Sequence, residues 1–166
     1  AVIRRLTLLR HGHAEPETDA GDFARKLDPR GHAEAHASGA RLHALHLQPQ
    51  LVLASPARRT EQTAKEIIAS LELPPERLHL EARLYLADSD TITEIAARTA
   101  DAVHHLLIVG HNPGLSACAA QFGGHRAHPL VTGAYCSLAF ELPHWRDLPS
   151  AAAESLRQEA PSARAT

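Results

Sequence analysis

This sequence has few cysteines, no long apolar run and no excess of charge of one sign. The two cysteines, Cys118 and Cys136, are too few for a disulfide framework, so we expect reduced thiols in a cytoplasmic protein. No apolar run reaches the roughly 18 residues that a membrane-spanning helix needs. The formal net charge is −2, which gives no reason to expect binding to nucleic acid or to a membrane surface.

The composition is that of an ordinary soluble globular protein, with 44% hydrophobic and 22% charged residues. A chain of 166 residues is long enough for one domain with a substantial core. We therefore expect a single domain over residues 1–148. The Ala-, Ser- and Glu-rich tail, residues 149–166, is expected to be a short helix or disordered.

Short apolar runs alternate with segments of helical periodicity along the chain. The patterns predict strands at 2–9, 51–54, 78–80, 106–109 and 134–142, and helices at about 29–46, 55–71, 91–103 and 113–121. The last strand alternates in polarity, which is typical of a half-exposed edge strand. The alternation of strands and helices predicts an α/β fold: a three-layer sandwich with a mostly parallel central sheet and helices on both faces.

Charged and nucleophilic groups follow three of the predicted strands at the point where each strand ends. Arg10-His11-Gly12 follows the first strand, Ser55 and Arg59 the second, and His111-Asn112 the strand at 106–109. The carboxyl ends of parallel strands meet at one sheet edge, so these groups should converge. Arginine suits phosphate, histidine can act as a nucleophile, and glycine allows a sharp turn. The sequence therefore predicts an anion site.

Several residues near this site allow more than one interpretation. Only one of the neighbours Arg58 and Arg59 can face the site, and the spacing from Ser55 favours Arg59. Ser55 is first a helix cap and second a phosphate contact. His13 is either a rim contact or simply exposed, and Arg25 is expected to be solvated rather than bound to substrate.

A zinc site is the alternative suggested by the many histidines. His32 and His36 have the i, i+4 spacing that can bind zinc on a helix. No carboxylate or cysteine completes the set, and His11 with His13 lacks further ligands as well. We therefore expect no metal.

The order of these motifs resembles the histidine phosphatase superfamily, whose fold is phosphoglycerate-mutase-like. Its Arg-His-Gly element stands here as Arg10-His11-Gly12, its Ser-x-x-x-Arg element as residues 55–59, and its second histidine as His111. Within the superfamily the chain is most similar to the small bacterial SixA-type phosphohistidine phosphatases, over about residues 5–142. The segments that carry this similarity are Asp22–Leu27 leading to Gly31, Ser55-Pro56, Glu61–Thr63 and His111–Gly114.

The resemblance implies a mechanism without metal or cofactor. His11 would attack phosphorus and form a phosphohistidine, while Arg10, Arg59 and His111 would hold the phosphoryl oxygens. The other ring nitrogen of His11 should donate a hydrogen bond to a nearby backbone carbonyl, which fixes the tautomer. We expect the two arginines to favour the neutral, nucleophilic form of His11. Further substrate contacts are expected from Gly12 and Asn112.

The leaving group decides the substrate class. A phosphate ester needs a general acid, for which Glu81, with Asp88 behind it, is the nearest candidate. A phosphohistidine has a nitrogen leaving group that depends much less on such an acid. Only about fifty residues separate Arg59 from His111, too few for a large lid insertion, so an open pocket is expected.

We therefore expect a phosphatase that acts on phosphohistidine in proteins. The alternatives are a phosphatase for small phosphate esters and a non-catalytic module that binds phosphorylated partners. The expected partner is a phosphorylated protein or a small phosphorylated substrate, not nucleic acid or membrane. The sequence leaves the oligomeric state open, and we favour a monomer.

Overall fold

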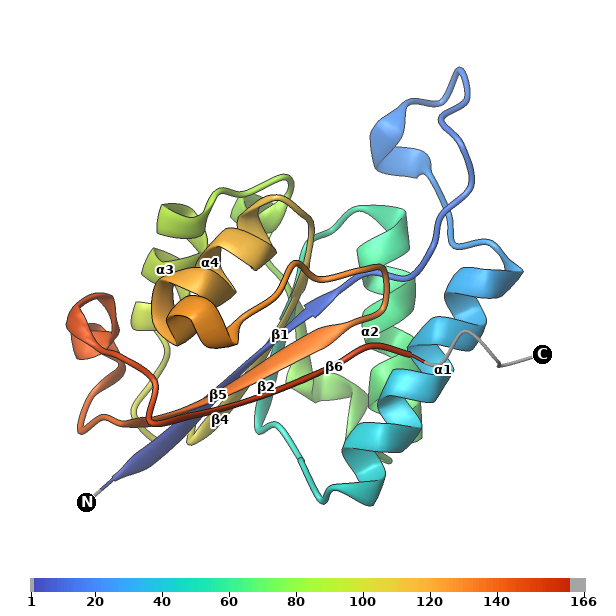
Figure 1. Ribbon diagram of the computed structural model, residues 1–166. Helices are drawn as coiled ribbons and strands as arrows, with labels where there is room; N and C mark the ends of the chain where they lie inside the picture. The colour runs from blue at the N-terminus through green and yellow to red at the C-terminus, as the bar shows by residue number, and fades with distance from the viewer. Residues whose placement is uncertain (1, 162–166) are drawn as a thin grey trace.

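The computed structural model describes residues 2–161 and contains one six-stranded sheet with the strand order β3-β2-β4-β1-β5-β6 (Figure 1). Strands β3, β2, β4 and β1 are parallel to one another, whereas β5 is antiparallel to β1 and β6 is antiparallel to β5. The strands span Ile3–Arg10 (β1), Leu51–Ala54 (β2), Leu78–Leu80 (β3), His105–Gly110 (β4), Tyr135–Glu141 (β5) and Ser155–Glu159 (β6). The four longest helices are Pro29–Ala44 (α1), Arg58–Ser70 (α2), Ser89–Ala97 (α3) and Gly114–Gly123 (α4).

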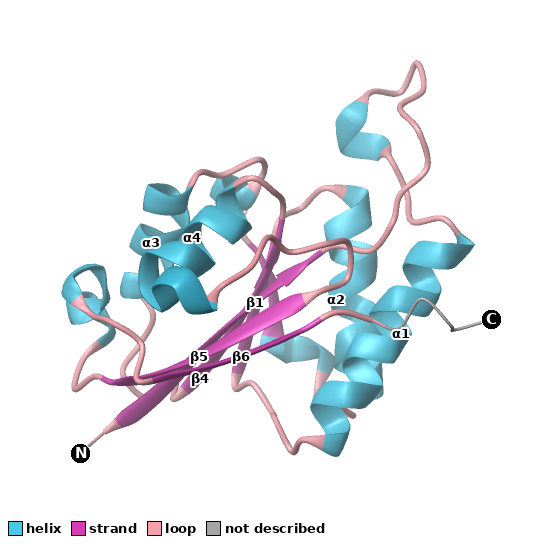
Figure 2. Ribbon diagram, viewed as in Figure 1, coloured by secondary structure: helices cyan, strands magenta, loops and turns pink. Residues whose placement is uncertain are grey.

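Helices cover both faces of the sheet, which confirms the predicted three-layer α/β sandwich (Figure 2). Alternate residues of a strand point to opposite faces, and both faces are apolar here. In β1, Leu8 packs in the core under α3 and α4, and Leu9 packs in the core under α1 and α2. Ile108 and Val109 of β4 divide in the same way. This two-sided burial explains the uninterrupted apolar runs at 51–54 in β2 and 106–109 in β4.

Helix α1 begins at Pro29 as expected, whereas α2 and α3 begin at other residues than the sequence predicted. The Asp28 carboxylate accepts a hydrogen bond from the Gly31 amide at 2.8 Å, and Asp88 caps α3 in the same way through Thr91. The expectation that Ser55 caps α2 is wrong, because α2 begins at Arg58 with Ala57 as its N-cap. The expected helix at 91–103 was also too long, because α3 ends at Ala97.

The C-terminal segment differs most from the sequence prediction. Residues 155–159 form β6, which pairs with β5, so the expected helical or disordered tail from 149 is wrong for this part. As a result β5 lies inside the sheet between β1 and β6 and is not an edge strand. Its alternating polar residues include Ser137, which is buried and hydrogen-bonded to Thr7. Residues 162–166 of the expected tail lie outside the described residues.

The segment between β1 and α1 extends away from the sheet and then turns back to begin α1 (Figure 1). A bridge between Ala14 and Leu27 closes its base, and the short 3-10 helix Asp22–Ala24 lies in its outer part. The amide of Leu27 donates to the side chain of Gln62 on α2 at 2.8 Å. These contacts tie the loop to α2, whose first turn carries Arg59.

Both cysteines are unpaired and buried, which confirms the expected free thiols. Burial raises the pKa of Cys118 to about 11 and that of Cys136 to about 12, so neither is a ready nucleophile. Across residues 2–161, none of the helices has the length and apolar character that crossing a membrane requires.

Candidate active site

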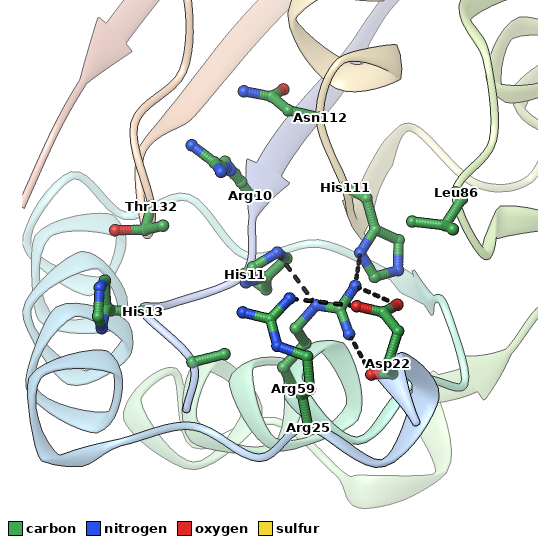
Figure 3. Close-up of a pocket in the computed structure, with 11 residues that line it drawn as sticks. Arg10, His11, His13, Asp22, Arg25, Arg59, Leu86, His111, Asn112 and Thr132 are labelled. Atoms are coloured by element: carbon green, nitrogen blue, oxygen red, sulfur yellow. Dashed lines mark hydrogen bonds and ion pairs between the residues drawn. The ribbon is translucent and has the colours of Figure 1, made fainter. Parts of the chain in front are cut away.

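A cavity of about 390 Å³ lies at the carboxyl ends of β1 and β4 (Figure 3). The structure therefore brings the ends of these strands together with the first turn of α2, as the sequence predicted. The lining residues are Arg10, His11, His13, Ala14, Asp22, Arg25, Arg59, Leu86, His111, Asn112 and Thr132. Three arginines face one cavity, which makes it suitable for a phosphoryl group.

His11 is buried and held as one tautomer. Its Nδ1 donates to the carbonyl of Gly12 at 2.7 Å, which is the backbone contact expected from the sequence. Its Nε2 therefore carries a lone pair, and the Nε of Arg59 donates to it at 3.3 Å. The pKa of His11 is lowered to about 4, mainly by burial and further by Arg59 and Arg10. The expected neutral histidine thus results from desolvation first and from the arginines second.

Arg59 lies in the first turn of α2 and is 3% exposed. Its Nη1 donates to the backbone carbonyl of Asp22 at 2.9 Å, and its Nη2 donates to the carboxylate of Asp22 at 3.1 Å. The same Nη2 lies 3.2 Å from Nδ1 of His111. Arg59 therefore joins both histidines of the site and the loop after β1. The neighbour Arg58 is exposed, as expected from the spacing.

His111 is positioned by Ser55. The Nε2 of His111 donates to the Ser55 hydroxyl at 2.8 Å, which leaves Nδ1 to accept from Arg59. Burial lowers the pKa of His111 to about 3, with Arg59 and His11 adding to the effect. Ser55 is fully buried and does not line the cavity. It therefore supports His111 and is neither a helix cap nor a direct part of the cavity wall.

Arg10 and Asn112 are anchored to one backbone carbonyl. Nη1 of Arg10 donates to the carbonyl of Leu130 at 3.1 Å, and the Asn112 amide donates to the same carbonyl at 2.8 Å. Burial lowers the pKa of Arg10 from its ordinary value, yet a guanidinium stays charged at neutral pH. The loop before β5 thus orients one of the cationic groups of the cavity.

Gly12 is required where the chain turns after His11. A Cβ atom at this position would lie 2.4 Å from the carbonyl oxygen of Gly31, too close for any side chain. The Gly12 amide donates to the hydroxyl of Thr63 at 3.1 Å. Gly12 does not line the cavity, so it acts through the turn that aims His11.

Asp22 and Arg25 line the cavity, although the sequence favoured a solvated loop for this segment. The Asp22 carboxylate accepts from Arg25 at 3.1 Å and from the hydroxyl of Tyr85 at 2.5 Å. Its pKa is lowered to about 2, first by Tyr85 and then by the two arginines that contact it. The sequence did contain a signal for this placement, because the Asp22–Leu27 segment is part of the similarity to the SixA-type phosphatases. That similarity did not by itself assign a role to Asp22.

The structure does not bring Glu81 to the cavity. Its carboxylate accepts from the amide of Arg83 at the start of the 3-10 helix Ala82–Leu84. It lines a different hollow together with Leu51 and Leu53. Glu81 follows β3, which is the edge strand and is separated from β4 by β2. The expectation that Glu81 serves as the general acid of this cavity is therefore wrong. Asp88 is occupied as the cap of α3.

The remaining histidines do not form a metal site. His32 pairs with Glu66 on α2 at 2.9 Å. Within residues 2–161, no group of three or more histidine, cysteine or carboxylate side chains has the geometry to hold a metal ion. His13 lines the rim of the cavity and contacts the Asp28 carboxylate through Nδ1.

The comparisons with known sequences agree with this geometry. The sequence model of the histidine phosphatase superfamily (branch 1) matches residues 6–85. An uncharacterised protein of Mycobacterium tuberculosis (strain H37Rv) is 36% identical over 111 residues, covering 67% of each chain. An uncharacterised chloroplastic protein of Arabidopsis thaliana is 29% identical over 140 residues, which cover 75% of this chain and 61% of that protein. The match thus spans less than two thirds of the Arabidopsis relative.

Solved structures extend the similarity to nearly the whole chain. A protein of Nakamurella multipartitia assigned as phosphohistidine phosphatase SixA has a TM-score of 0.79 at 27% identity, covering 98% of this chain and 99% of that one. The protein histidine phosphatase SixA complexed with tungstate has a TM-score of 0.78 at 24% identity, covering 95% and 97%, and supports the fold. The chain belongs to the histidine phosphatase superfamily and has its phosphoglycerate-mutase-like fold.

Proposed function

We propose that this protein is a phosphatase that works through a phosphohistidine on His11 and needs no metal ion. The observation that carries the proposal is the unprotonated Nε2 of a buried, neutral histidine in a cavity lined by three arginines, one of which, Arg59, donates to it. Nε2 attacks phosphorus, the bond to the leaving group breaks, and water then displaces His11 to release inorganic phosphate.

The charges of the cavity match a phosphoryl group. Arg10, Arg25 and Arg59 with Asp22 carry a net charge of +2, which balances a phosphoryl dianion. Arg10 and Arg59 hold its oxygens. The dianion also raises the pKa of the neighbouring His111, because a nearby negative charge favours the protonated ring. Protonated His111 then donates to a further oxygen.

The substrate class follows from the carboxylates. Glu81 lies in another hollow, and Asp22, which lines the cavity, is ionised, so none of the described residues 2–161 places a carboxylic acid to protonate an ester oxygen. A phosphoramidate depends less on such an acid. We therefore favour phosphohistidine in a protein, and the name of the Nakamurella relative also specifies phosphohistidine. The alternative of a small phosphate ester has less support, and a non-catalytic module would not need an unprotonated Nε2 on His11.

The proposal extends to the setting of the protein. The buried free thiols fit a reducing compartment, so we place the protein in the cytoplasm. We propose that it acts as a monomer on a phosphorylated protein partner.

The test is the His11→Ala variant. It should abolish hydrolysis of an aryl phosphate, and acid-labile phosphate should be trapped on the wild type but not on the variant. His36→Ala, which changes an exposed histidine on α1, is the matched control. Retained hydrolysis by His11→Ala would refute the mechanism. A panel of phosphohistidine proteins and small phosphate esters, compared by kcat/KM, decides the substrate class.

A further inference from the structure

Asp22 is the one carboxylate that lines the cavity, as far as residues 2–161 are concerned (Figure 3). Oδ2 accepts from Tyr85 at 2.5 Å and from Arg59 at 3.1 Å, whereas Oδ1 accepts from Arg25 at 3.1 Å. Each carboxylate oxygen can accept two hydrogen bonds, so Oδ1 has room for one more donor. The side chain of Asp22 is 31% exposed, so such a donor can reach it through the mouth of the cavity.

Tyr85 fixes this carboxylate relative to the reacting groups. The Tyr85 ring packs edge-on against His111, with ring centroids 5.5 Å apart, and against Phe23 at 5.1 Å. Phe23 follows Asp22 in the 3-10 helix of the loop. The hydroxyl and the ring of Tyr85 thus hold the loop, its carboxylate and His111 in one arrangement.

The charge state of Asp22 limits what it can do. The groups that face it are Arg25 in its own loop, Arg59 on α2, Tyr85 before α3 and His111 after β4. Tyr85 and the arginines keep its pKa at about 2, so it is ionised at neutral pH. An ionised carboxylate cannot protonate an ester oxygen, but it can bind and stabilise a cationic N–H group.

We propose that Asp22 binds the protonated imidazole ring of a phosphohistidine substrate and thereby selects this leaving group over an ester oxygen. This inference rests on the proposed function. The ring donates a hydrogen bond to Asp22 from the N–H of the nitrogen that carries no phosphoryl group. When His11 Nε2 forms its bond to phosphorus, the P–N bond breaks and its electron pair stays on the ring. The ring keeps its proton and leaves as neutral histidine.

The same carboxylate disfavours esters. A departing ester oxygen gains negative charge and carries no proton of its own, so an adjacent ionised carboxylate repels it. Asp22 therefore attracts a protonated imidazole leaving group and repels an ester oxygen, and the two effects together favour phosphohistidine over phosphate esters. The exposed Leu86, which lines the same cavity, offers the ring an apolar contact.

The experiment compares a phosphohistidine peptide with p-nitrophenyl phosphate as substrates of the wild type and Asp22→Asn. The ratio of the two kcat/KM values, phosphohistidine over ester, should fall at least tenfold in the variant. The alkaline limb of the phosphohistidine pH profile should move about one unit to lower pH, because the carboxylate no longer stabilises the protonated ring. Asp19→Asn, which removes the same charge at an exposed position of the same loop, is the matched control.

Tyr85→Phe is the second variant, in case Asp22→Asn folds poorly. It keeps the ring packing and removes the hydroxyl that holds the carboxylate, so the ratio should fall in the same direction by a smaller factor. Circular dichroism checks the fold of each protein. A parallel change for both substrates with an unmoved alkaline limb would show a merely structural role and overturn the inference.

The failure of this inference is distinguishable from that of the proposed function. A wild type that hydrolyses the aryl phosphate through His11 but not phosphohistidine overturns the proposed substrate and this inference together. A wild type that hydrolyses both, with an unchanged ratio in Asp22→Asn, overturns the role of Asp22 alone.

Discussion

The Nε of Arg59 lies 3.3 Å from the Nε2 of His11, although the two residues are 48 positions apart in the chain. The contact joins the end of β1 to the first turn of α2. Together with the hydrogen bond from Nδ1 to the Gly12 carbonyl, it fixes the tautomer and the orientation of the His11 ring at the cavity wall. The reactive nitrogen and the guanidinium beside it are therefore positioned by one long-range contact.

Arg59→Ala should lower kcat/KM for an aryl phosphate by about two orders of magnitude or more. The variant loses charge-assisted hydrogen bonds to the phosphoryl group, each worth about 1.5–3 kcal/mol. Arg58→Ala removes the same charge from the exposed neighbour and should change the rate less than about threefold. Steady-state kinetics of the two variants test this prediction, and an equal loss of kcat/KM in both would contradict the assignment of Arg59 as a phosphoryl-binding residue.

His11 should titrate near pH 4 in the free protein, well below the ordinary histidine value of about 6.5. A lowered pKa means that the nucleophile is neutral above this value and is lost by protonation below it. The acidic limb of kcat/KM should therefore lie near pH 4. NMR titration of the imidazole signals gives the pKa directly, with the signal assigned through His11→Ala. A value near the ordinary one would show that burial does not control this residue.

His105 should make the fold sensitive to acid. Burial lowers its pKa to about 3, and Nε2 of His105 contacts the Thr7 hydroxyl at 2.8 Å. The folded pKa lies below the unfolded one, so the stabilisation is complete above about pH 6.5 and is lost as the pH falls toward 3. The free energy of unfolding should drop by up to about 1.4 kcal/mol per pH unit for each such histidine.

The measurement for His105 is urea unfolding at about pH 7 and about pH 5 for the wild type and His105→Gln. The variant should lose less stability between the two pH values than the wild type, because His11 and His111 still contribute but His105 does not. Equal losses would mean that His105 titrates normally in the folded protein.

Gly12→Ala should destabilise the fold by about 1–3 kcal/mol and reduce activity. The added methyl group would lie 2.4 Å from the Gly31 carbonyl oxygen, so the turn must shift and carry His11 with it. In Gly110→Ala the methyl group would meet Leu115 carbons at 3.5 Å or more, which is ordinary contact. Thermal unfolding of both variants tests the prediction, and a Gly12→Ala variant as stable as Gly110→Ala would contradict it.

The positions of β1, β2 and β4 and of the reactive groups at their ends could be predicted because the signals are local. An apolar run that stops at Arg10-His11-Gly12 or at His111 specifies both a buried strand and the reactive groups directly after it. The general rule for parallel sheets then brings the ends together. The start of α1 at Pro29 could be predicted for the same reason, since its cap Asp28 acts within one helical turn.

The pairing of strands far apart in the chain could not be predicted from the sequence. The alternation of β5 indicated an edge strand, but β6 pairs with it and buries Ser137 against Thr7. Glu81 follows a strand just as Arg10 does, and only the strand order shows that this strand lies two positions away from β4. The residues of a strand do not by themselves specify its partner strands or its position in the sheet.

The sequence by itself thus determined the fold class and the four groups Arg10, His11, Arg59 and His111, because each follows from a local pattern and one general rule of sheet geometry. Only the tertiary structure shows that Ser55 hydrogen-bonds to His111 and that Glu81 lines a different hollow. It also shows that Asp22 is held at the cavity by hydrogen bonds from Tyr85 and Arg59. The position of Glu81 depends on strand order, that of Ser55 on a contact with His111 56 positions away, and that of Asp22 on how the loop after β1 folds back.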